Sequence, residues 1–495
     1  MSEEASDTPD QTSPETCDVC IVGAGIAGLN ALCVASTYLA RDQRIILVDR
    51  RDRVGGMWVD TYDYVRLHQP HELFTAGDIG WTLDAAPSYL ATKGEVLDHF
   101  EHCLQVIRER VRVDELFGHT LESDEETDGV VRITCRSKDG HTVDITAKRL
   151  IKAYGFRVET NDPLAVSSSR VRSISPDHTD IRGAVADDDA PVWVIGSGKT
   201  AMDTVHTLVT RRPGRQVNLV AGTGTYFLNR DKAFPSGAAR WWRGVRPNAI
   251  IARCARRFDG TNEDDLVEWS RSLYGTSPIP EARHFLLGIL SEAESATIAA
   301  GLHEVIMDHF VDAVDDGDSV DIVLRSGTTV PVAPRSWIVN CTGYLLTTEV
   351  PYEPYVSASG AVVSIQPRSA TFHVSSFAGY YLTHLLFQGK IRDTPLYAVD
   401  TQEVYRRAKT AVPFVMLTLS YRNIGVVADV LPTSALTGCG LDFDRWYPLP
   451  RRLVGTLGFL ATHRRDRVVQ ERALDRVGER FGVRTGVLDH AAIAG

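Results

Sequence analysis

The sequence has few cysteines, no long hydrophobic run and no basic, apolar N-terminal segment. Its eight cysteines are scattered over 495 residues, which is too sparse for a disulfide framework and fits a reducing compartment. The N-terminus is acidic and polar and therefore lacks the features of a secretory signal. The longest apolar run of interest, Ala411 to Tyr421, is about half a membrane span. We therefore expect a cytoplasmic protein with no membrane partner.

The chain also lacks an excess of positive charge, because 53 lysines and arginines stand against 64 aspartates and glutamates, for a net charge of -11. Nucleic-acid binding normally needs a broad cationic field, so we expect no nucleic-acid partner. Residues 1–16 hold five acidic residues and no basic one, and we expect them to form a disordered tail. The composition is otherwise ordinary, with 43% hydrophobic residues. The length is about three times that of a common single domain, which predicts at least two compact cores.

Two segments have the pattern of a dinucleotide-binding unit, in which a buried strand runs into a glycine-rich turn that opens a helix. The first unit has a strand at 19–22, a helix through Leu39 and a second strand at 44–49. The second unit has a strand at 192–195, a helix through Val209 and a second strand at 216–220. The turns are Gly23, Ala24, Gly25, Ile26, Ala27 and Gly28 in the first unit, and Gly196, Ser197, Gly198, Lys199, Thr200 and Ala201 in the second.

The context of the first turn makes it strong evidence for a bound dinucleotide. Its first two glycines permit a tight turn and the approach of a pyrophosphate to backbone N–H groups, and its third lets the helix pack against the strand. Asp49 lies 21 residues past Gly28, where an acidic residue can accept hydrogen bonds from the adenosine ribose. The second turn ends in alanine, which still permits close packing. It is not a P-loop, because the first glycine of that motif would fall at Trp193, so a nicotinamide nucleotide fits better.

Strand patterns indicate that the second unit is inserted into the first domain. A hairpin centred on residues 138–140 precedes the second unit, and strands within 320–332 lead to a further strand and glycine at 336–343. We expect an α/β fold with two Rossmann-like, doubly wound, three-layer dinucleotide-binding domains and a mostly helical C-terminal region. The expected divisions are 1–16 for the tail, 17–160 for the first domain, 161–334 for the second domain with a helical insertion at about 231–300, 335–400 for the return of the first domain, and 401–495 for the helical region.

Longer motifs extend this pattern beyond the glycine turns. Residues 49–58 combine an acidic residue, a basic stretch and Gly55-Gly56-Met57-Trp58, and residues 61–70 read T-Y-D-Y-V-R-L-H-Q-P. Residues 89–95 read Y-L-A-T-K-G-E, and residues 340–344 read N-C-T-G-Y. In these motifs and their order the chain resembles the flavin-containing monooxygenase family, the class B flavoprotein monooxygenases, and the run at 61–70 is similar to that of the YUCCA branch. The resemblance covers about residues 18–103, 190–205 and 336–345.

The resemblance implies one FAD domain and one NADPH domain. It assigns FAD binding to Gly23, Gly25, Ile26, Ala27, Gly28, Asp49, Arg50, Gly55, Gly56, Met57, Trp58 and His68, and it assigns NADPH binding to Gly196, Ser197, Gly198, Lys199, Thr200 and Ala201, with Thr342 and Gly343 in a further cofactor turn. His68 is the catalytic candidate, in a position where many family members have asparagine. A buried histidine can donate a hydrogen bond toward flavin or bound oxygen, or it can be purely structural. Residues 372–379 precede a helix whose N-terminus would lie near the flavin pyrimidine or would simply belong to the core.

Several departures from the family pattern concern the nicotinamide nucleotide. Ala221 and Gly222 end the second strand without the acidic residue of an NAD site and without the arginine that the family uses for a 2′-phosphate. The alternative candidates for that phosphate are Arg211, Arg212, Arg215 and Arg230. The family's linker motif is reduced to His178, and Tyr154 replaces a threonine in the first A-T-G-like turn. NADPH is therefore favoured over NADH only mildly.

The expected function is the oxygenation of a small organic substrate. In the family's reaction NADPH reduces FAD, O₂ adds to form a C4a-(hydro)peroxyflavin, and one oxygen atom passes to a nitrogen, a sulfur or a carbonyl compound. The sequence offers no metal-ligand set and no Ser/His/Asp set, as expected where the cofactor does the chemistry. The alternative is an FAD-dependent oxidase or dehydrogenase that is reduced by its substrate and has abandoned NADPH, and a third hypothesis is a flavin-binding regulatory protein without turnover. The expected partners are a small molecule and O₂, and the sequence leaves open whether the protein forms a homo-oligomer.

Overall fold

A computed structural model describes residues 14–156, 158–343 and 345–488. The first sheet has the strand order β3-β2-β1-β6-β5-β4, with β18 beside β6. β1 is parallel to β2 and β6, whereas β4, β5 and β6 are joined as antiparallel hairpins. The strands are β1 (Glu15–Val22), β2 (Arg44–Asp49), β3 (Arg112–Phe117), β4 (His119–Thr127), β5 (Val130–Ser137), β6 (Thr142–Lys152) and β18 (Val362–Ser364).

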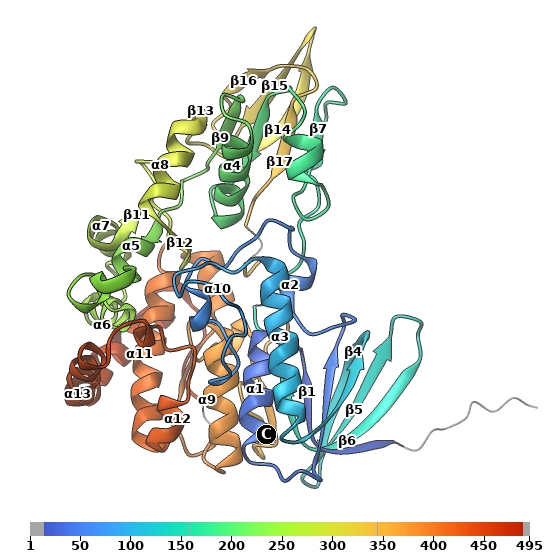
Figure 1. The fold of residues 1–495 in the computed structure, drawn as a ribbon, viewed down its shortest axis with the longest axis vertical. Coiled ribbons are helices and arrows are strands. Elements are labelled where there is room, and N and C mark those ends of the chain that lie inside the picture. Colours follow the sequence, from blue (N-terminus) through green and yellow to red (C-terminus); the bar gives the residue numbers. More distant parts are fainter. Residues whose placement is uncertain (1–13, 157, 344, 489–495) are drawn as a thin grey trace, which may run out of the picture.

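Helices from distant parts of the sequence stand beside this sheet (Figure 1). α1 (Ile26–Ser36) follows β1 and packs against α9 (Ser375–Phe387). The two helices lie so close together that a Cβ at Gly379 of α9 would lie 2.2 Å from the carbonyl oxygen of Ala27. α3 (Lys93–Arg108) begins at a capping box formed by Thr92 and Glu95. The shorter elements of this domain are α2 (Met57–Asp60), η1 (His71–Leu73) and η4 (Pro367–Ser369).

The second domain has a parallel sheet with the strand order β13-β9-β8-β17-β7. α4 (Lys199–Arg211) connects β8 to β9 and packs against α8 (Glu292–Gly301), which precedes β13. An antiparallel sheet of β14, β15 and β16 lies at the far end of this domain (Figure 1). The remaining bounds are β7 (Arg172–Ile174), η2 (Ile181–Val185), β8 (Val192–Ile195), β9 (Val217–Val220), β13 (Leu302–Ile306), β14 (Phe310–Asp316), β15 (Ser319–Leu324), β16 (Thr329–Val332) and β17 (Trp337–Asn340).

The two Rossmann-like domains are confirmed, but two expected boundaries move. β17 pairs with β7 and β8, so it is a strand of the second sheet, whereas the sequence placed residues 335–343 in the return of the first domain. A short apolar run that ends in glycine looks the same in either sheet, and only its pairing decides between them. The first domain resumes at β18. Glu15 and Thr16 pair with β6 and are therefore not part of a disordered tail, while residues 1–13 lie outside the described residues.

The insertion and the C-terminal region are mainly helical, as expected. The sequence placed the insertion at about 231–300, whereas in the structure α8 packs on α4 of the second domain and the insertion runs from β10 (Phe227–Asn229) to β12 (Ile289–Leu290). Between these strands it contains α5 (Arg230–Ala233), η3 (Gly237–Trp241), α6 (Pro247–Arg257), α7 (Glu263–Tyr274) and β11 (Gly275–Thr276). The C-terminal region contains α10 (Thr401–Arg407), α11 (Val412–Val430), α12 (Thr433–Thr437), η5 (Phe443–Trp446) and α13 (Leu449–Phe481). β19 (Tyr397–Val399) pairs with β20 (Thr485–Val487), and α11 packs against both α6 and α13.

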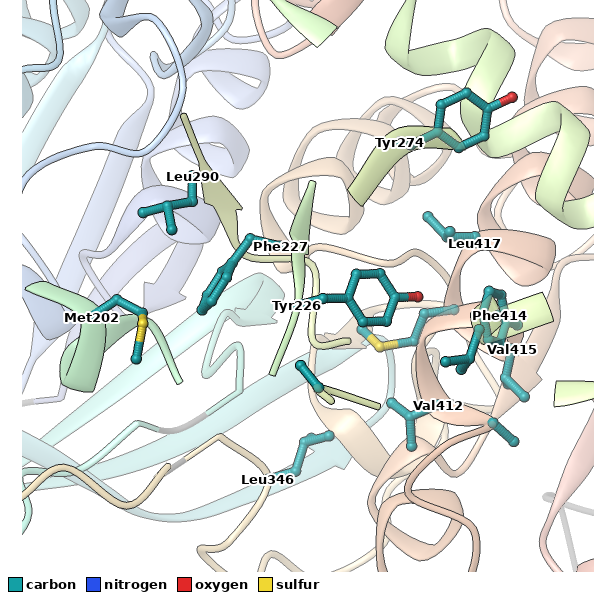
Figure 2. Close-up of a cluster of buried hydrophobic side chains, with 14 of the residues drawn as sticks. Met202, Tyr226, Phe227, Tyr274, Leu290, Leu346, Val412, Phe414, Val415 and Leu417 are labelled. Atoms are coloured by element: carbon teal, nitrogen blue, oxygen red, sulfur yellow. The ribbon is translucent and has the colours of Figure 1, made fainter. Parts of the chain in front are cut away.

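One apolar core joins the second domain to both helical segments. Figure 2 shows Tyr226 and Phe227 between Met202 of α4 and Phe414 of α11. All four side chains are buried in the same cluster. The insertion therefore does not stand apart as a separate lobe, because it is packed between the second sheet and the C-terminal helices.

The α1–α9 contact generates a stability prediction. Gly379→Ala should lower the free energy of unfolding by about 1–3 kcal/mol, because the new methyl group overpacks the interface. Gly94→Ala in α3 is the matched control, since a Cβ at Gly94 meets nothing within 4 Å. The control should be neutral or stabilising by up to about 1 kcal/mol. Urea unfolding measures both variants, and equal midpoints would contradict the prediction.

Candidate active site

The first glycine turn joins β1 to α1 and is packed tightly against its own backbone. A Cβ at Gly28 would lie 1.7 Å from the carbonyl oxygen of Gly23, and a Cβ at Gly23 would lie 2.6 Å from that of Ala153. Gly25 is the N-cap of α1 and offers no side-chain cap to the first N–H groups of the helix. The turn therefore presents backbone donors at the positive end of a helix dipole, as an anion site requires.

Asp49 at the end of β2 supports this turn. Its carboxylate accepts hydrogen bonds from the backbone N–H of Ala24 at 2.6 Å and from that of Arg51 at 2.9 Å. A carboxylate has about four acceptor positions, so it retains capacity for ribose hydroxyls. The side chain of the neighbouring Arg50 forms an ion pair with Glu159, with 3.6 Å between Nη1 and Oε1. Asp49 thus orders the turn whether or not a nucleotide is bound.

The Gly55-Gly56 turn lies directly on the first glycine turn. The N–H of Gly55 donates to the carbonyl oxygen of Ala24 at 3.0 Å. A Cβ at Gly56 would lie 2.7 Å from the Cα of Gly25, and the φ of Gly56 is +56°, which favours glycine. The two turns can lie this close only because neither carries a side chain. Met57 and Trp58 follow at once in α2.

The second glycine turn joins β8 to α4 and repeats this design. A Cβ at Gly196 would lie 2.4 Å from the carbonyl oxygen of Cys341 at the end of β17. Ala201 is fully buried, as expected for the packing position of the motif. Gly198 is the N-cap of α4, and a Cβ there meets nothing within 4 Å. The open space in this turn therefore lies at Gly198.

Three other predicted cofactor residues mainly order loops. The hydroxyl of Ser197 donates to the carbonyl oxygen of Ala221 at 2.8 Å. The hydroxyl of Thr342 donates to Asn340 Oδ1 at 2.7 Å. Gly343 follows Thr342 and lines the cavity between the two glycine turns.

The segment at 61–70 connects the two domains. The hydroxyl of Tyr62 donates to Asp203 Oδ2 at 2.9 Å, and the hydroxyls of Tyr64 and Thr204 are hydrogen-bonded at 2.6 Å. Asp203 and Thr204 belong to α4, and Asp203 also pairs with Lys199 in the first turn of that helix. These bonds hold the N-terminal half of α4 against the first domain.

A cavity of about 490 Å³ lies between the two glycine turns. Small-molecule sites usually measure about 300–1,000 Å³. The predicted site residues that line it are Gly25, Ile26, Gly55, Met57, Trp58, His68, Gly198, Lys199, Thr200 and Gly343. The predicted residues outside its lining are Gly23, Ala27, Gly28, Asp49, Arg50, Gly56, Gly196, Ser197, Ala201 and Thr342. Both motifs therefore open to the same space.

Most of the remaining wall is apolar and comes from segments to which the sequence analysis assigned no role. Tyr226 and Phe227 come from the start of the insertion, Phe285 comes from its end, and Phe414 and Leu417 come from α11. No sequence motif marks such positions, because aromatic and aliphatic residues at these spacings are indistinguishable from core residues. Only the fold brings them around one space.

His68 lines this cavity as a neutral side chain. Its Nδ1 accepts a hydrogen bond from the backbone N–H of Ile289 at 3.3 Å, which leaves the proton on Nε2. Burial, together with the positive charges of Lys199 and Arg230, lowers the pKa of His68 to about 3. The backbone carbonyl of His68 also accepts from Arg230 Nε at 2.8 Å. His68 is therefore a fixed, uncharged hydrogen-bond donor at neutral pH.

The N-terminus of α9 faces the same cavity from the first domain. Ser375, Ser376 and Phe377 line it together with Ile26 and Trp58. The N-cap residue provides no side-chain hydrogen bond, so the positive end of the helix dipole is directed toward the cavity. The helix expected to follow residues 372–379 begins inside that stretch, at Ser375, and its proximity to a flavin stays a prediction.

Two buried polar atoms beside the cavity lack a protein partner. Thr61 Oγ1 and Gln69 Oε1 belong to cavity-lining residues, and neither has a hydrogen bond within the described part of the chain. A buried polar atom without a partner is costly, so such atoms usually meet a ligand or water. Both therefore fit a site that binds a polar ring.

The arginines predicted for a 2′-phosphate lie elsewhere. Arg211 and Arg212 are at the end of α4, and Arg215 precedes β9, so all three lie at the sheet edge opposite the glycine turn. Arg212 pairs with Asp189, and Arg215 donates to backbone carbonyls. Arg230 forms an ion pair with Glu294, with 2.8 Å between Nη1 and Oε2. The end of β9 is instead next to a histidine.

That histidine is His309, which follows β13. A Cβ at Gly222 would lie 3.0 Å from its ring. Burial lowers the pKa of His309, and the positive charges of Arg325 and Lys409 act in the same direction. The end of β9 therefore lies beside His309, with Arg325, Lys409 and the acidic Asp308 close to that histidine, and no sequence motif predicted this arrangement.

The lowered pKa of His68 generates a pH prediction. An unfolded histidine titrates near pH 6.5, whereas the folded one resists protonation down to about pH 3. Stability is therefore lost as the pH falls below 6.5, and the His68 contribution to this loss between pH 7 and pH 5 should be about 2 kcal/mol. His68→Asn removes the titrating group. Urea unfolding at both pH values should show a shallower loss for the variant, and identical losses would contradict the assignment.

Comparisons with known proteins agree with this geometry. Residues 17–240 match the pyridine nucleotide-disulphide oxidoreductase family. Uncharacterized protein Rv2000 of Mycobacterium tuberculosis is 25% identical to this chain over 352 residues. The match covers 66% of this chain and spans only 60% of the length of that relative. MymA of M. tuberculosis, named as an FAD-containing monooxygenase, is 37% identical over 60 residues, 12% of each chain. The oxidized steroid monooxygenase bound to NADP has a TM-score of 0.52 at 16% identity and covers 86% of this chain and 98% of its own.

At this identity the structural match shows the fold alone, and the fold is the one that the motifs predicted. The family match covers the first glycine turn, the segment at 61–70 and the second glycine turn. The chain therefore has a fold similar to that of the steroid monooxygenase, and its residues 17–240 match the pyridine nucleotide-disulphide oxidoreductase family.

Proposed function

We propose that the protein is an FAD-dependent, NADPH-using monooxygenase that transfers one oxygen atom from O₂ to an apolar small molecule. One observation carries this proposal: the two dinucleotide turns open to a single cavity whose remaining wall is largely apolar. A flavin and a nicotinamide must meet for hydride transfer, and an oxygenation site must also exclude water. A cavity with this composition meets both requirements.

The residues of the first domain fit FAD. The turn of Gly23, Gly25 and Gly28 supplies backbone donors for the pyrophosphate, and Asp49 has acceptor capacity for the ribose. The Gly55-Gly56 turn adds a surface without side chains, close to the unpartnered Thr61 Oγ1 and Gln69 Oε1. When bound there, FAD would supply the electron transfer and the activation of O₂.

The chain itself would orient the reactants and control charge. His68 holds a proton on Nε2 and can donate one hydrogen bond into the cavity. The N-terminus of α9 stabilises negative charge on its side of the cavity. Phe227, Phe285 and Phe414 keep the substrate end dry, which favours an apolar substrate.

Two named relatives support the monooxygenase reading. MymA is named as an FAD-containing monooxygenase, and the similar structure of the steroid monooxygenase was determined with NADP bound. The second glycine turn supports the use of the same nucleotide here, since the backbone at Gly198 is open to an incoming pyrophosphate. The chemical class of the oxidised atom stays open.

One observation favours a second candidate, an oxidase or dehydrogenase reduced by its own substrate. Arg211, Arg212 and Arg215 are directed away from any 2′-phosphate site, and the end of β9 carries only Ala221 and Gly222. If His309 and its cationic neighbours do not hold the phosphate, NADPH use has been lost. The two candidates differ in which molecule reduces the flavin.

The test is anaerobic mixing of the yellow protein with NADPH and, separately, with NADH. We expect saturable bleaching of the oxidised-flavin absorbance by NADPH. Gly198→Ala should keep its FAD content but raise the Kd of NADP⁺ at least about tenfold, because the methyl group occupies the space that the pyrophosphate needs. Gly80→Ala is the matched control, since a Cβ there also meets nothing within 4 Å and the residue lies outside the cavity lining.

The outcomes separate the candidates. Bleaching by NADPH followed by O₂ consumption that depends on an apolar substrate supports the monooxygenase. Absence of bleaching by either nucleotide, with bleaching by an organic substrate, would replace it with the oxidase. An unchanged Kd in Gly198→Ala would contradict the nucleotide position inferred here.

A further inference from the structure

The first half of α13 presents an apolar face to solvent. Five large side chains, Leu449, Leu453, Val454, Leu457 and Leu460, are each between 50% and 70% exposed. At about 100° per residue, the four leucines fall within an arc of about 80° on the helix surface. Soluble proteins rarely leave such a contiguous apolar face uncovered without a binding role.

The turn η3 places two exposed tryptophans beside this helix. Trp241 and Trp242 are 53% and 70% exposed. The guanidinium of Arg451, in the first turn of α13, donates to the backbone carbonyls of Arg240, Arg243 and Gly244 around them. We call Trp241, Trp242 and the five residues of α13 the apolar surface. It lies at the outer edge of the molecule, where α13 runs beside α6 and α11 (Figure 1).

The segments that carry the apolar surface are strongly basic. Residues 237–257 and 445–465 contain eleven arginines and no aspartate or glutamate, in a chain whose net charge is -11. Arg246 and Arg256 are paired with Asp444 and Asp466. Arg464 and Arg465, at the end of the apolar face, pair with Asp429 and Asp466, yet their side chains are still 76% and 78% exposed. These two segments therefore carry a net positive charge, whereas the chain as a whole is negative.

We propose that the apolar surface docks on the interface of an anionic lipid bilayer. Exposed leucines and tryptophans flanked by arginines are the features of an interfacial helix, in which the apolar residues enter the headgroup region and the cations attract acidic lipids. Tryptophan in particular favours the boundary between headgroups and acyl chains. A neutral protein partner would not require this excess of arginine, and a second copy of the chain would bring the same positive charge to the contact.

The docking would not involve a membrane span. Among the described helices, none is long and apolar enough to cross a bilayer. The sequence alone led us to expect no membrane partner, because the chain has no long apolar run and carries a net charge of -11. The fold brings two basic segments that are almost 200 residues apart in sequence to one face, as the contact between Arg451 and η3 shows.

The apolar surface and the cavity share a structural element. Pro247, Ile250, Ile251 and Cys254 of α6 line the cavity. α13 packs on α6, where Arg256 donates to Asp466 at 2.6 Å. Docking would therefore bring the apolar cavity wall close to a lipid phase in which an apolar substrate dissolves. The inference goes beyond the proposed function and does not depend on which molecule reduces the flavin.

The experiment is flotation of the FAD-loaded protein with vesicles of phosphatidylcholine alone or with about one third phosphatidylglycerol. We expect binding to the anionic vesicles that falls at least about tenfold in high salt. Leu453→Ser with Leu457→Ser should reduce the partition coefficient at least about tenfold, and Arg464→Glu with Arg465→Glu should abolish the preference for phosphatidylglycerol. Val311→Ser on β14, where Val311 is 55% exposed, is the matched control and should bind as the unaltered protein does.

Flavin content, far-UV circular dichroism and light scattering are recorded for every variant. Folded variants that lose vesicle binding while the control retains it support the proposal. Failure of the unaltered protein to float with anionic vesicles overturns it. A change from dimer to monomer in the leucine variant, without any vesicle binding by the unaltered protein, would instead assign the surface to a second copy of the chain. Since vesicle binding is measured without NADPH, it can fail while the proposed reaction succeeds, and the reverse.

Discussion

The contact between the segment at 61–70 and α4 is the constraint on which the site depends. The hydroxyl of Tyr62 bonds Asp203, and that of Tyr64 bonds Thr204, so the first domain holds the second by the N-terminal half of one helix. That half begins at Gly198, the open position of the second glycine turn. Fixing α4 in this way directs both dinucleotide turns into one cavity, and without it each turn would be an isolated nucleotide site.

The insertion and the C-terminal helices supply the remaining walls of the cavity between the two glycine turns. α6 and α11 close the cavity with aliphatic and aromatic side chains, and Tyr226, Phe227 and Phe414 lock them to the second sheet (Figure 2). The outer neighbour of α6 is α13, which carries the apolar surface. A single packed unit thus links the substrate end of the cavity to the face that we propose contacts lipid. This arrangement agrees with both of our proposals, that the protein oxidises an apolar molecule away from water and that it docks on a bilayer.

The sequence predicted the parts whose chemistry is local. Gly28 and Gly198 follow from the turn that a pyrophosphate requires, and the strands and helices around them were placed within a few residues. β17 was assigned to the wrong domain because strand pairing is not local. Arg215 was a candidate by its charge, and only the topology shows that it lies at the opposite edge of the sheet. The cavity wall could not be predicted, since Phe285 resembles any core residue until the fold surrounds a space with it.

The most direct test of the central claim is the electron density of the protein crystallised with FAD and NADP⁺. The account predicts density for the flavin ring in the cavity between the Gly55–Trp58 turn and the N-terminus of α9, with His68 beside it. It also predicts that the nucleotide pyrophosphate lies on the backbone at Gly198 and that both ligands enter the same cavity. A flavin ring directed to solvent, or a nucleotide bound away from that cavity, would contradict the account.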